Sequence, residues 1–219
     1  GNLAAVENAE GEWELLQFQT ATLVAPGTYK LGMLLRGQFG SEAAMRTPVT
    51  AGARFILLDE AVSAVDMTSD DIGLLLNWRY GPLGEPIDDL AYRTEARAYA
   101  GLGLRPLSPV HLQGKRDPVG GDWTFIWVRR TRIHGDGWEA PEAPLGEAEE
   151  EYRLEILDAP GGDVLRSIDL GAPSFLYAAA MQTADFGAPQ WNVAIRVTQM
   201  SASYGAGAPA EALTYDYQH

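Results

Sequence analysis

The sequence predicts an all-β protein in which an N-terminal β-rich domain is followed by a β-sandwich. Short apolar runs bounded by glycine, proline or acidic residues fill the first half of the chain. In the second half, large apolar residues recur at every second position in three separate runs. Runs of this length and period favour strands over helices, because successive strand side chains point to opposite faces.

The first half contains four runs that predict strands. The first of them alternates two partly apolar sets of side chains, as expected for a strand that is covered on both faces. A turn is expected at 25–28, because Pro26 fixes its own φ and Gly27 can take a positive φ. Residues 41–46 favour one helical turn with Ser41 as its N-cap. The expected strands are 13–20, 29–35, 54–58 and 72–80.

A break between the two halves is expected at 101–109. Two glycines and two prolines lie within these nine residues, which makes them a poor helix and a poor central strand. We therefore predict two domains, 1–106 and 107–219, and both carry a net negative charge.

The second half predicts a sandwich because three strands each present one large apolar face. Covering such faces requires a second sheet. Burial of three tryptophans and one phenylalanine would contribute roughly 8–12 kcal/mol before chain entropy is subtracted. The side chains expected to face inward are Trp123, Phe125 and Trp127, then Tyr152, Leu154 and Ile156, then Trp191, Val193, Ile195 and Val197.

Composition narrows the function before any motif is considered. Sixteen basic residues against 30 acidic ones give a formal charge of −14, which disfavours binding to nucleic acid. The absence of cysteine excludes disulfides, thiolate metal sites and a cysteine nucleophile. No apolar run approaches the roughly 18 residues that a membrane helix needs. The chain begins with Gly1 and shows no signal-peptide pattern, so we expect it to be a piece of a longer protein.

No motif of catalysis or cofactor binding stands out. The three histidines, His111, His134 and His219, have no second histidine at zinc-ligand spacing, so we expect no metal site. The sequence has no nucleophile elbow, no phosphate-binding loop and no dinucleotide-binding loop. We therefore expect no enzyme activity, no cofactor and no catalytic residue.

Two charge clusters are interpreted as surface features. The acidic residues Glu147 and 149–151 favour a solvated rim over a catalytic carboxylate pair or a calcium site. Arg129, Arg130 and Arg132 could hold phosphate or carboxylate groups. Neutralisation by acidic neighbours is the preferred interpretation, and the neighbours in question are Asp136, Glu139 and Glu142.

Three aromatic residues are candidates for contact with a sugar or a protein. Trp138 lies in a long polar insertion at about 131–150, where it could either cover the edge of the sandwich or be exposed for binding. Trp78 and Tyr80 pose the same alternative at the end of a predicted strand.

Residues 108–217 resemble a fibronectin type III-like module, through SPVHL at 108–112 and the three amphipathic runs. More narrowly, the chain resembles the C-terminal region of phage tail baseplate hub proteins, a group that includes the tail hub of gene transfer agents. The segments that carry this resemblance are WELLQF (13–18), LVAPGTY (23–29), LLRGQFGSE (34–42), WVRRTRIHGDGW (127–138), PLGE (144–147) and ADFGA (184–188). The family usually has arginine where Phe39 stands.

The resemblance implies a structural component of a phage-like tail tip or baseplate, with other tail proteins as partners. It also implies an oligomeric state in the assembled tail, a place at the tail tip of a virion-like particle, and contact with a host surface glycan. Assembly would take place in the cytoplasm before release. The alternative is a carbohydrate-binding module in which Trp138, Trp78 and Tyr80 stack on a cell-surface glycan.

Overall fold

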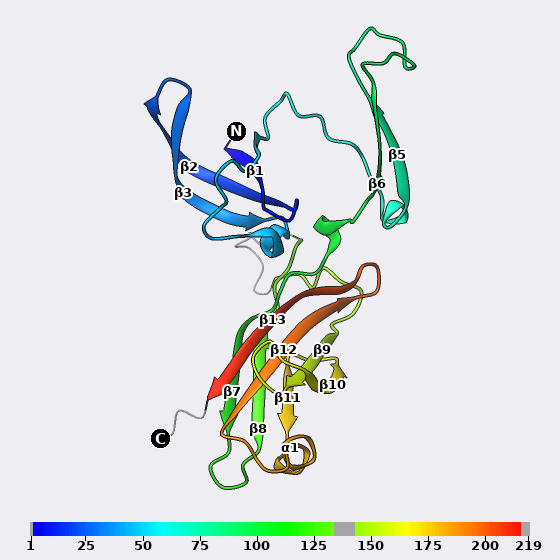
Figure 1. Cartoon of the computed structure of the whole chain (residues 1–219). Coiled ribbons are helices and arrows are strands. Elements are labelled where there is room, and N and C mark those ends of the chain that lie inside the picture. The colour runs from blue at the N-terminus through cyan, green and yellow to red at the C-terminus, as the bar shows by residue number, and fades with distance from the viewer. Residues whose placement is uncertain (1, 134–142, 216–219) are drawn as a thin grey trace. The chain divides into compact units, whose positions relative to one another are not determined.

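The structure is a computed structural model that describes residues 2–133 and 143–215 (Figure 1). The chain divides into two compact units, of which one comprises Gly1–Arg36 and Arg46–Leu102 and the other comprises Gly37–Met45 and Gly103–His219. The sequence-based boundary was placed at 106/107, and it assigned residues 37–45 to the first domain. No helix in the described part of the chain is long and apolar enough to cross a membrane.

The first unit contains one four-stranded sheet and a separate two-stranded ribbon. The strand order of the sheet is β3-β2-β1-β4, and β5 pairs with β6 alone. The described core cluster of the sheet is small, with Ala4, Val6 and Leu16 buried. The strands are β1 (Leu3–Glu7), β2 (Trp13–Ala25), β3 (Thr28–Gln38), β4 (Phe55–Leu57), β5 (Leu75–Tyr80) and β6 (Arg93–Ala98).

The second unit is a β-sandwich. One sheet has the order β11-β8-β7 and the other has the order β10-β9-β12-β13. This arrangement of three strands against four is that of a fibronectin type III-like sandwich, and the predicted all-β class is confirmed. The strands are β7 (Val110–Arg116), β8 (Trp123–Val128), β9 (Tyr152–Leu157), β10 (Val164–Leu170), β11 (Ser174–Tyr177), β12 (Asn192–Ser201) and β13 (Gly205–Tyr215).

The core of the sandwich confirms the inward face predicted for β8. Trp123 and Phe125 are 0% exposed, and Trp127 is 4% exposed. The rings of Trp123 and Phe125 stack with their centroids 5.8 Å apart. Trp127 meets Tyr152 of the opposite sheet edge to face at 5.3 Å. Such aromatic pairs stabilise a core beyond the area that they bury.

The prediction for Trp191 was wrong. The chain bends at Trp191, and β12 begins only at Asn192, so the indole is 57% exposed. The guanidinium of Arg116 lies 4.1 Å from the centroid of the Trp191 ring. A cation–π contact therefore takes the place of burial, and two tryptophans rather than three fill the core.

The predicted helical turn at 41–46 is a short 3-10 helix, Ser41–Ala44, with Gly40 at its N-cap position. Ser41 is therefore not the cap, and its hydroxyl donates to the carbonyl of Gln38 at 2.7 Å. Gly40 takes this position because its φ of 80° suits glycine. Two other 3-10 turns, Ser69–Asp71 and Leu102–Leu104, complete the short helices of the described chain.

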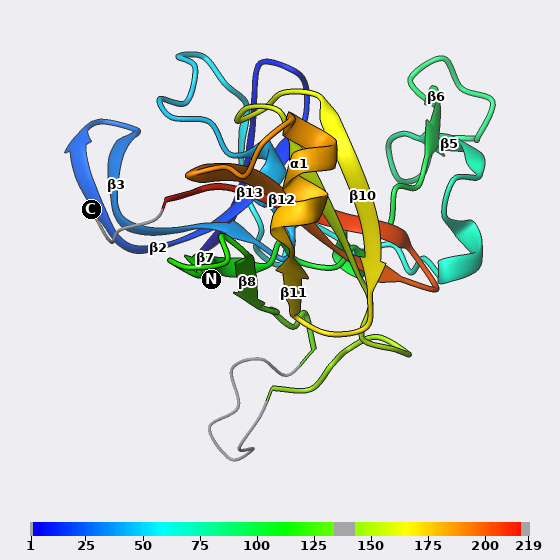
Figure 2. The same cartoon turned by 90° about the horizontal axis from the view of Figure 1, so that it is seen from below.

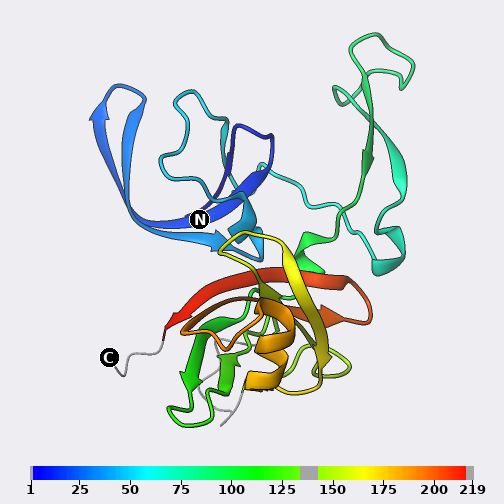
Figure 3. The same cartoon turned by 60° about the horizontal axis from the view of Figure 1, so that its bottom comes forward.

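One α-helix, α1 (Ala179–Phe186), follows β11 at one end of the sandwich (Figures 2 and 3). Gln182 is its one buried residue. The Gln182 amide donates to the carbonyls of Gly121 and Tyr177 at 2.9 and 3.0 Å and accepts from the backbone N–H of Gln190. These three bonds join the β7–β8 loop, the end of β11 and the approach to β12.

A charged cluster fixes α1 to the sandwich. Asp185 of α1 accepts two hydrogen bonds from Arg166 of β10, at 2.7 and 2.8 Å, and one from the hydroxyl of Tyr177 at 2.6 Å. The bonds from Arg166 hold the pKa of Asp185 below its usual value. Burial, aided by the bond to Asp185, raises the pKa of Tyr177.

This cluster predicts an acid-sensitive contribution to stability. Because its pKa is lowered on folding, Asp185 stabilises the sandwich fully above its unfolded pKa of about 4, and this contribution falls as pH decreases further. We expect Asp185→Asn to lower the free energy of unfolding by about 1–2 kcal/mol at neutral pH. Urea unfolding from neutral to acidic pH should show the difference from wild type shrinking below about pH 4.

The matched control is Asp169→Asn, which removes a carboxylate from an exposed pair with Arg153. Solvent screens such a pair, so the control should unfold nearly as the wild type does. A loss for Asp185→Asn that stays constant down to acidic pH would contradict the assignment.

Candidate interaction surfaces

A long hairpin extends from the sheet of the first unit (Figure 1). β1 reaches only to Gln17 along β2, and β2 and β3 continue as a two-stranded ribbon. We call residues 18–35 the first arm. Large apolar side chains are exposed along it. Some of them are neighbours in sequence, and because successive strand side chains point to opposite faces, both faces of the ribbon carry exposed apolar groups. These side chains are Leu23, Val24, Tyr29, Met33, Leu34 and Leu35.

A buried ion pair anchors the base of the first arm. The Glu14 side chain is 2% exposed and accepts two hydrogen bonds from Arg36 of β3, at 2.7 and 2.5 Å. Arg36 also donates to the hydroxyl of Thr47 and the carbonyl of Arg46. The bonds to Glu14 raise the pKa of the Arg36 guanidinium. Since a buried carboxylate needs such partners, the pair fixes β3 beside β2 where the arm begins.

The ribbon of β5 and β6 forms a second arm, residues 75–98, and contains two of the predicted contact residues. Trp78 and Tyr80 lie two positions apart on β5 and therefore share a face. Trp78 is half-buried and Tyr80 is exposed. The Tyr80 hydroxyl donates to Glu95 of β6 at 2.8 Å, which raises the pKa of Tyr80.

Trp138, the third predicted contact residue, lies outside the described residues. So do His134 and His219, and Asp136, Glu139 and Glu142, the expected acidic partners of the arginine cluster. The described residues contain no group of three or more His, Asp or Glu that could hold a metal ion.

The arginine cluster lines a groove in the second unit. The groove has a volume of about 710 Å³, and Arg129, Arg130 and Arg132 lie along it with Arg105. We call it the arginine groove. Phe39 and Leu107 supply apolar surface, and the other described lining residues are Gly37, Gln38, Gly40, Gly103, Thr131 and Ala143.

Two carboxylates partly neutralise the arginine groove. Arg130 pairs with Glu42 at 2.5 Å, and Arg132 pairs with Glu147 at 3.1 Å. The side chain of Glu147 is buried, so the interpretation of this residue as part of a solvated rim was wrong. Its burial follows from the partnership with Arg132, which the spacing of acidic residues alone does not reveal.

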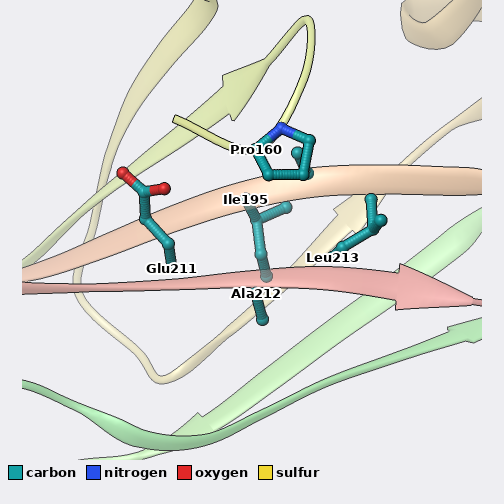
Figure 4. A pocket seen from close by; sticks show the side chains of 6 residues that line it. Pro160, Ile195, Glu211, Ala212 and Leu213 are labelled. Atoms are coloured by element: carbon teal, nitrogen blue, oxygen red, sulfur yellow. The ribbon is translucent and has the colours of Figure 1, made fainter. Parts of the chain in front are cut away.

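A second hollow lies beside β12 and β13 (Figure 4). It is open to solvent, has a volume of about 90 Å³ and is lined mainly by apolar residues, among them Pro160, Ile195 and Leu213. Glu211 at its rim is bound to Arg196 and to the backbone N–H of Gly161. Binding sites for small molecules typically measure several hundred Å³, so this hollow is too small to hold one.

Comparison with known proteins gives one family match. Residues 1–56 match the family described as "Rcc01698-like, C-terminal". Among solved structures, a Fn3-like protein from Clostridium thermocellum is 16% identical with a TM-score of 0.35, covering 52% of this chain and 97% of that chain. Domains d3–d4 of the rat CD45 extracellular region are 10% identical with a TM-score of 0.33, covering 90% and 93%. No curated protein matches.

Sequence reasoning found the aromatic pair on β5 but missed the two larger features. The first arm was predicted as two ordinary strands, because period and composition do not show whether a partner strand lies alongside. The groove was missed because residues 37–40 are far in sequence from 103–107 and 129–132. The sequence feature that pointed to the groove was the arginine cluster of Arg129, Arg130 and Arg132.

The exposed side chains of the first arm predict a surface that can be made polar without loss of stability. We expect Leu23→Thr, Val24→Thr and Leu34→Thr together to reduce binding of the dye ANS and to leave the unfolding temperature unchanged. The matched control is Leu16→Thr, at a buried position of β2, the strand that also carries Leu23 and Val24. It should destabilise the first unit by about 2–4 kcal/mol. An arm variant that unfolds as early as this control would show that the arm residues pack within the chain.

Proposed function

We propose that this chain is a structural, non-enzymatic component of a phage-like tail tip or baseplate, of the kind found in tailed phages and gene transfer agents. In this proposal it binds neighbouring tail proteins, uses no cofactor or metal, and belongs to a particle that forms in the cytoplasm and is released. The observation that carries the proposal is the first arm, a two-stranded ribbon with large apolar side chains exposed on both faces.

Such a ribbon calls for partners. An isolated two-stranded hairpin is at best marginally stable in water. Exposed apolar surface of this extent commonly marks a protein interface, since burying it upon association is favourable. The described core of the first unit contains three buried side chains against ten in the second. The first unit therefore has more to gain from neighbouring subunits.

Two further findings support the tail assignment. The family match covers residues 1–56, which include the whole first arm. The resemblance to baseplate hub proteins runs through the same segment, in LVAPGTY and LLRGQFGSE. In this proposal the sandwich is an accessory module, and its fold alone assigns it no role, because such folds serve many unrelated functions.

The location of the chain tests this proposal. We expect gold-labelled antibodies against the sandwich to mark the distal tail end of particles purified from the source organism. The first-arm threonine variant, made in the chromosomal gene, should fold but fail to enter particles. The matched control is Val119→Ser, at an exposed apolar position in the β7–β8 loop, and it should assemble normally. Label on the capsid, or particles that lack the chain, would contradict the assignment.

A carbohydrate-binding module is the second candidate function. Trp78 and Tyr80 on one face of β5, with Glu95 opposite on β6, place a hydrogen-bond acceptor beside an aromatic surface. Sugars stack on such surfaces through their apolar faces. This candidate predicts that host-surface polysaccharide quenches tryptophan fluorescence saturably and that Trp78→Ala reduces the quenching. The control is Trp13→Ala on β2, which should retain the response. A flat titration would eliminate this candidate.

A further inference from the structure

The tip of the second arm is ordered by its own polar contacts. We call residues 81–92 the tip. The Tyr92 hydroxyl donates to the carbonyls of Pro82 and Glu85 at 3.2 and 3.3 Å. Arg79 lies over the Tyr92 ring and donates to the carbonyl of Ile87. The shape of the loop is therefore fixed before any partner binds, which lowers the entropy cost of docking.

This ordered loop directs apolar side chains outward. Leu83 and Leu90 have exposures of 104% and 101%, the values of side chains that touch nothing around them, and Ile87 is also largely exposed. Between them lie Glu85 and two aspartates, and the tip contains no basic residue. A surface that receives the tip must therefore combine apolar area with positive charge.

The arginine groove has both properties. Four arginines line it, and two of them, Arg130 and Arg132, are paired with Glu42 and Glu147, so the groove keeps a net positive charge. Hydrogen bonds fix the guanidinium groups, as when Arg129 donates to the carbonyls of Pro144 and Ala143. Arg105 is held in the same way, since its Nη2 donates to the carbonyl of Gly207 at 3.1 Å.

Phe39 gives the groove its apolar surface. It is 66% exposed, and its φ of 53° lies in the left-handed region that few residues other than glycine adopt. Gly37, two residues earlier, also has a positive φ. The turn is tight there, because a Cβ at position 37 would lie only 2.7 Å from the sulfur of Met45. An exposed aromatic ring held in a strained turn indicates a functional contact, since such strain is usually retained at binding sites.

We propose that the tip of one copy docks into the arginine groove of a second copy. Charge identifies the occupant: with a net charge of −14, copies of this chain repel one another except where a basic surface receives an acidic one. The carboxylates of the tip would pair with the groove arginines while Leu83 and Leu90 cover Phe39. Because tip and groove are different surfaces, the contact is head-to-tail and generates a ring or an open chain of subunits.

This inference goes beyond the tail-tip assignment and does not depend on it. Self-association is a property of the purified chain, whereas the assignment is tested on particles. A chain that marks the tail tip but stays monomeric would contradict only the docking, and a self-associating chain absent from particles would contradict only the assignment.

Sedimentation velocity of the full chain tests the contact directly. We expect the average mass of the wild type to rise with concentration and the association to weaken between about 50 and about 500 mM NaCl. The tip variant, Leu83→Ser, Asp88→Lys and Leu90→Ser, should weaken association by roughly 30-fold or more. The groove variant, Phe39→Asn and Arg130→Gln, should have the same effect, and asparagine tolerates the left-handed φ of this position. Val119→Ser is the matched control and should associate normally.

Mixing the two variants separates this contact from any other. The tip variant retains an intact groove and the groove variant retains an intact tip, so the mixture should form a 1:1 dimer that does not grow further. A wild type that stays monomeric throughout would overturn the proposal. So would variants that associate as the wild type does, or a mixture in which no dimer forms. Circular dichroism of each variant shows whether a loss of association reflects unfolding.

Discussion

The apolar face of a β-sheet must be covered, and the two units of this chain meet that requirement differently. In the sandwich, each sheet covers the other: Trp127 of β8 meets Tyr152 of β9 across the interior, and Phe125 of β8 packs beside Tyr177 of the neighbouring strand β11. In the first unit, the sheet forms a single layer with a small described core, and its hairpin continues beyond the neighbouring strand. The apolar side chains of that hairpin are exposed, and this exposure is the basis of the assembly role proposed for the chain.

Polar contacts give the two ribbons their shape in place of a core. Arg36 and Glu14 join β3 to β2 at the base of the first arm. Arg79 and Tyr92 order the tip of the second arm. Interactions of this kind contribute modestly to net stability, but they restrict geometry because hydrogen bonds are directional. An arm ordered in this way can present apolar side chains to a partner without collapsing onto itself.

The predictable part of the fold is the amphipathic part. β8, β9 and β12 were found because their apolar residues recur at every second position, facing a covered interior. β10 and β13 were missed because they have mostly partial burial and a weaker pattern, and α1 was missed because its eight residues leave only Gln182 buried. Trp191 fits the alternating pattern yet lies outside the strand, since a pattern does not show where the backbone bends. The candidate surfaces follow the same logic: the aromatic pair on β5 is local in sequence and was found, whereas the groove combines four separate segments and was not.

The sequence by itself determined the β class, the acidic surface charge, and the inward face of the strand that carries Trp123, Phe125 and Trp127, because each depends on local pattern or on composition. Only the tertiary structure decided which strands pair, which apolar residues stay in water, and which arginines share a groove. Those outcomes depend on contacts between residues far apart in the chain, and alternation along a single strand carries no record of its neighbours.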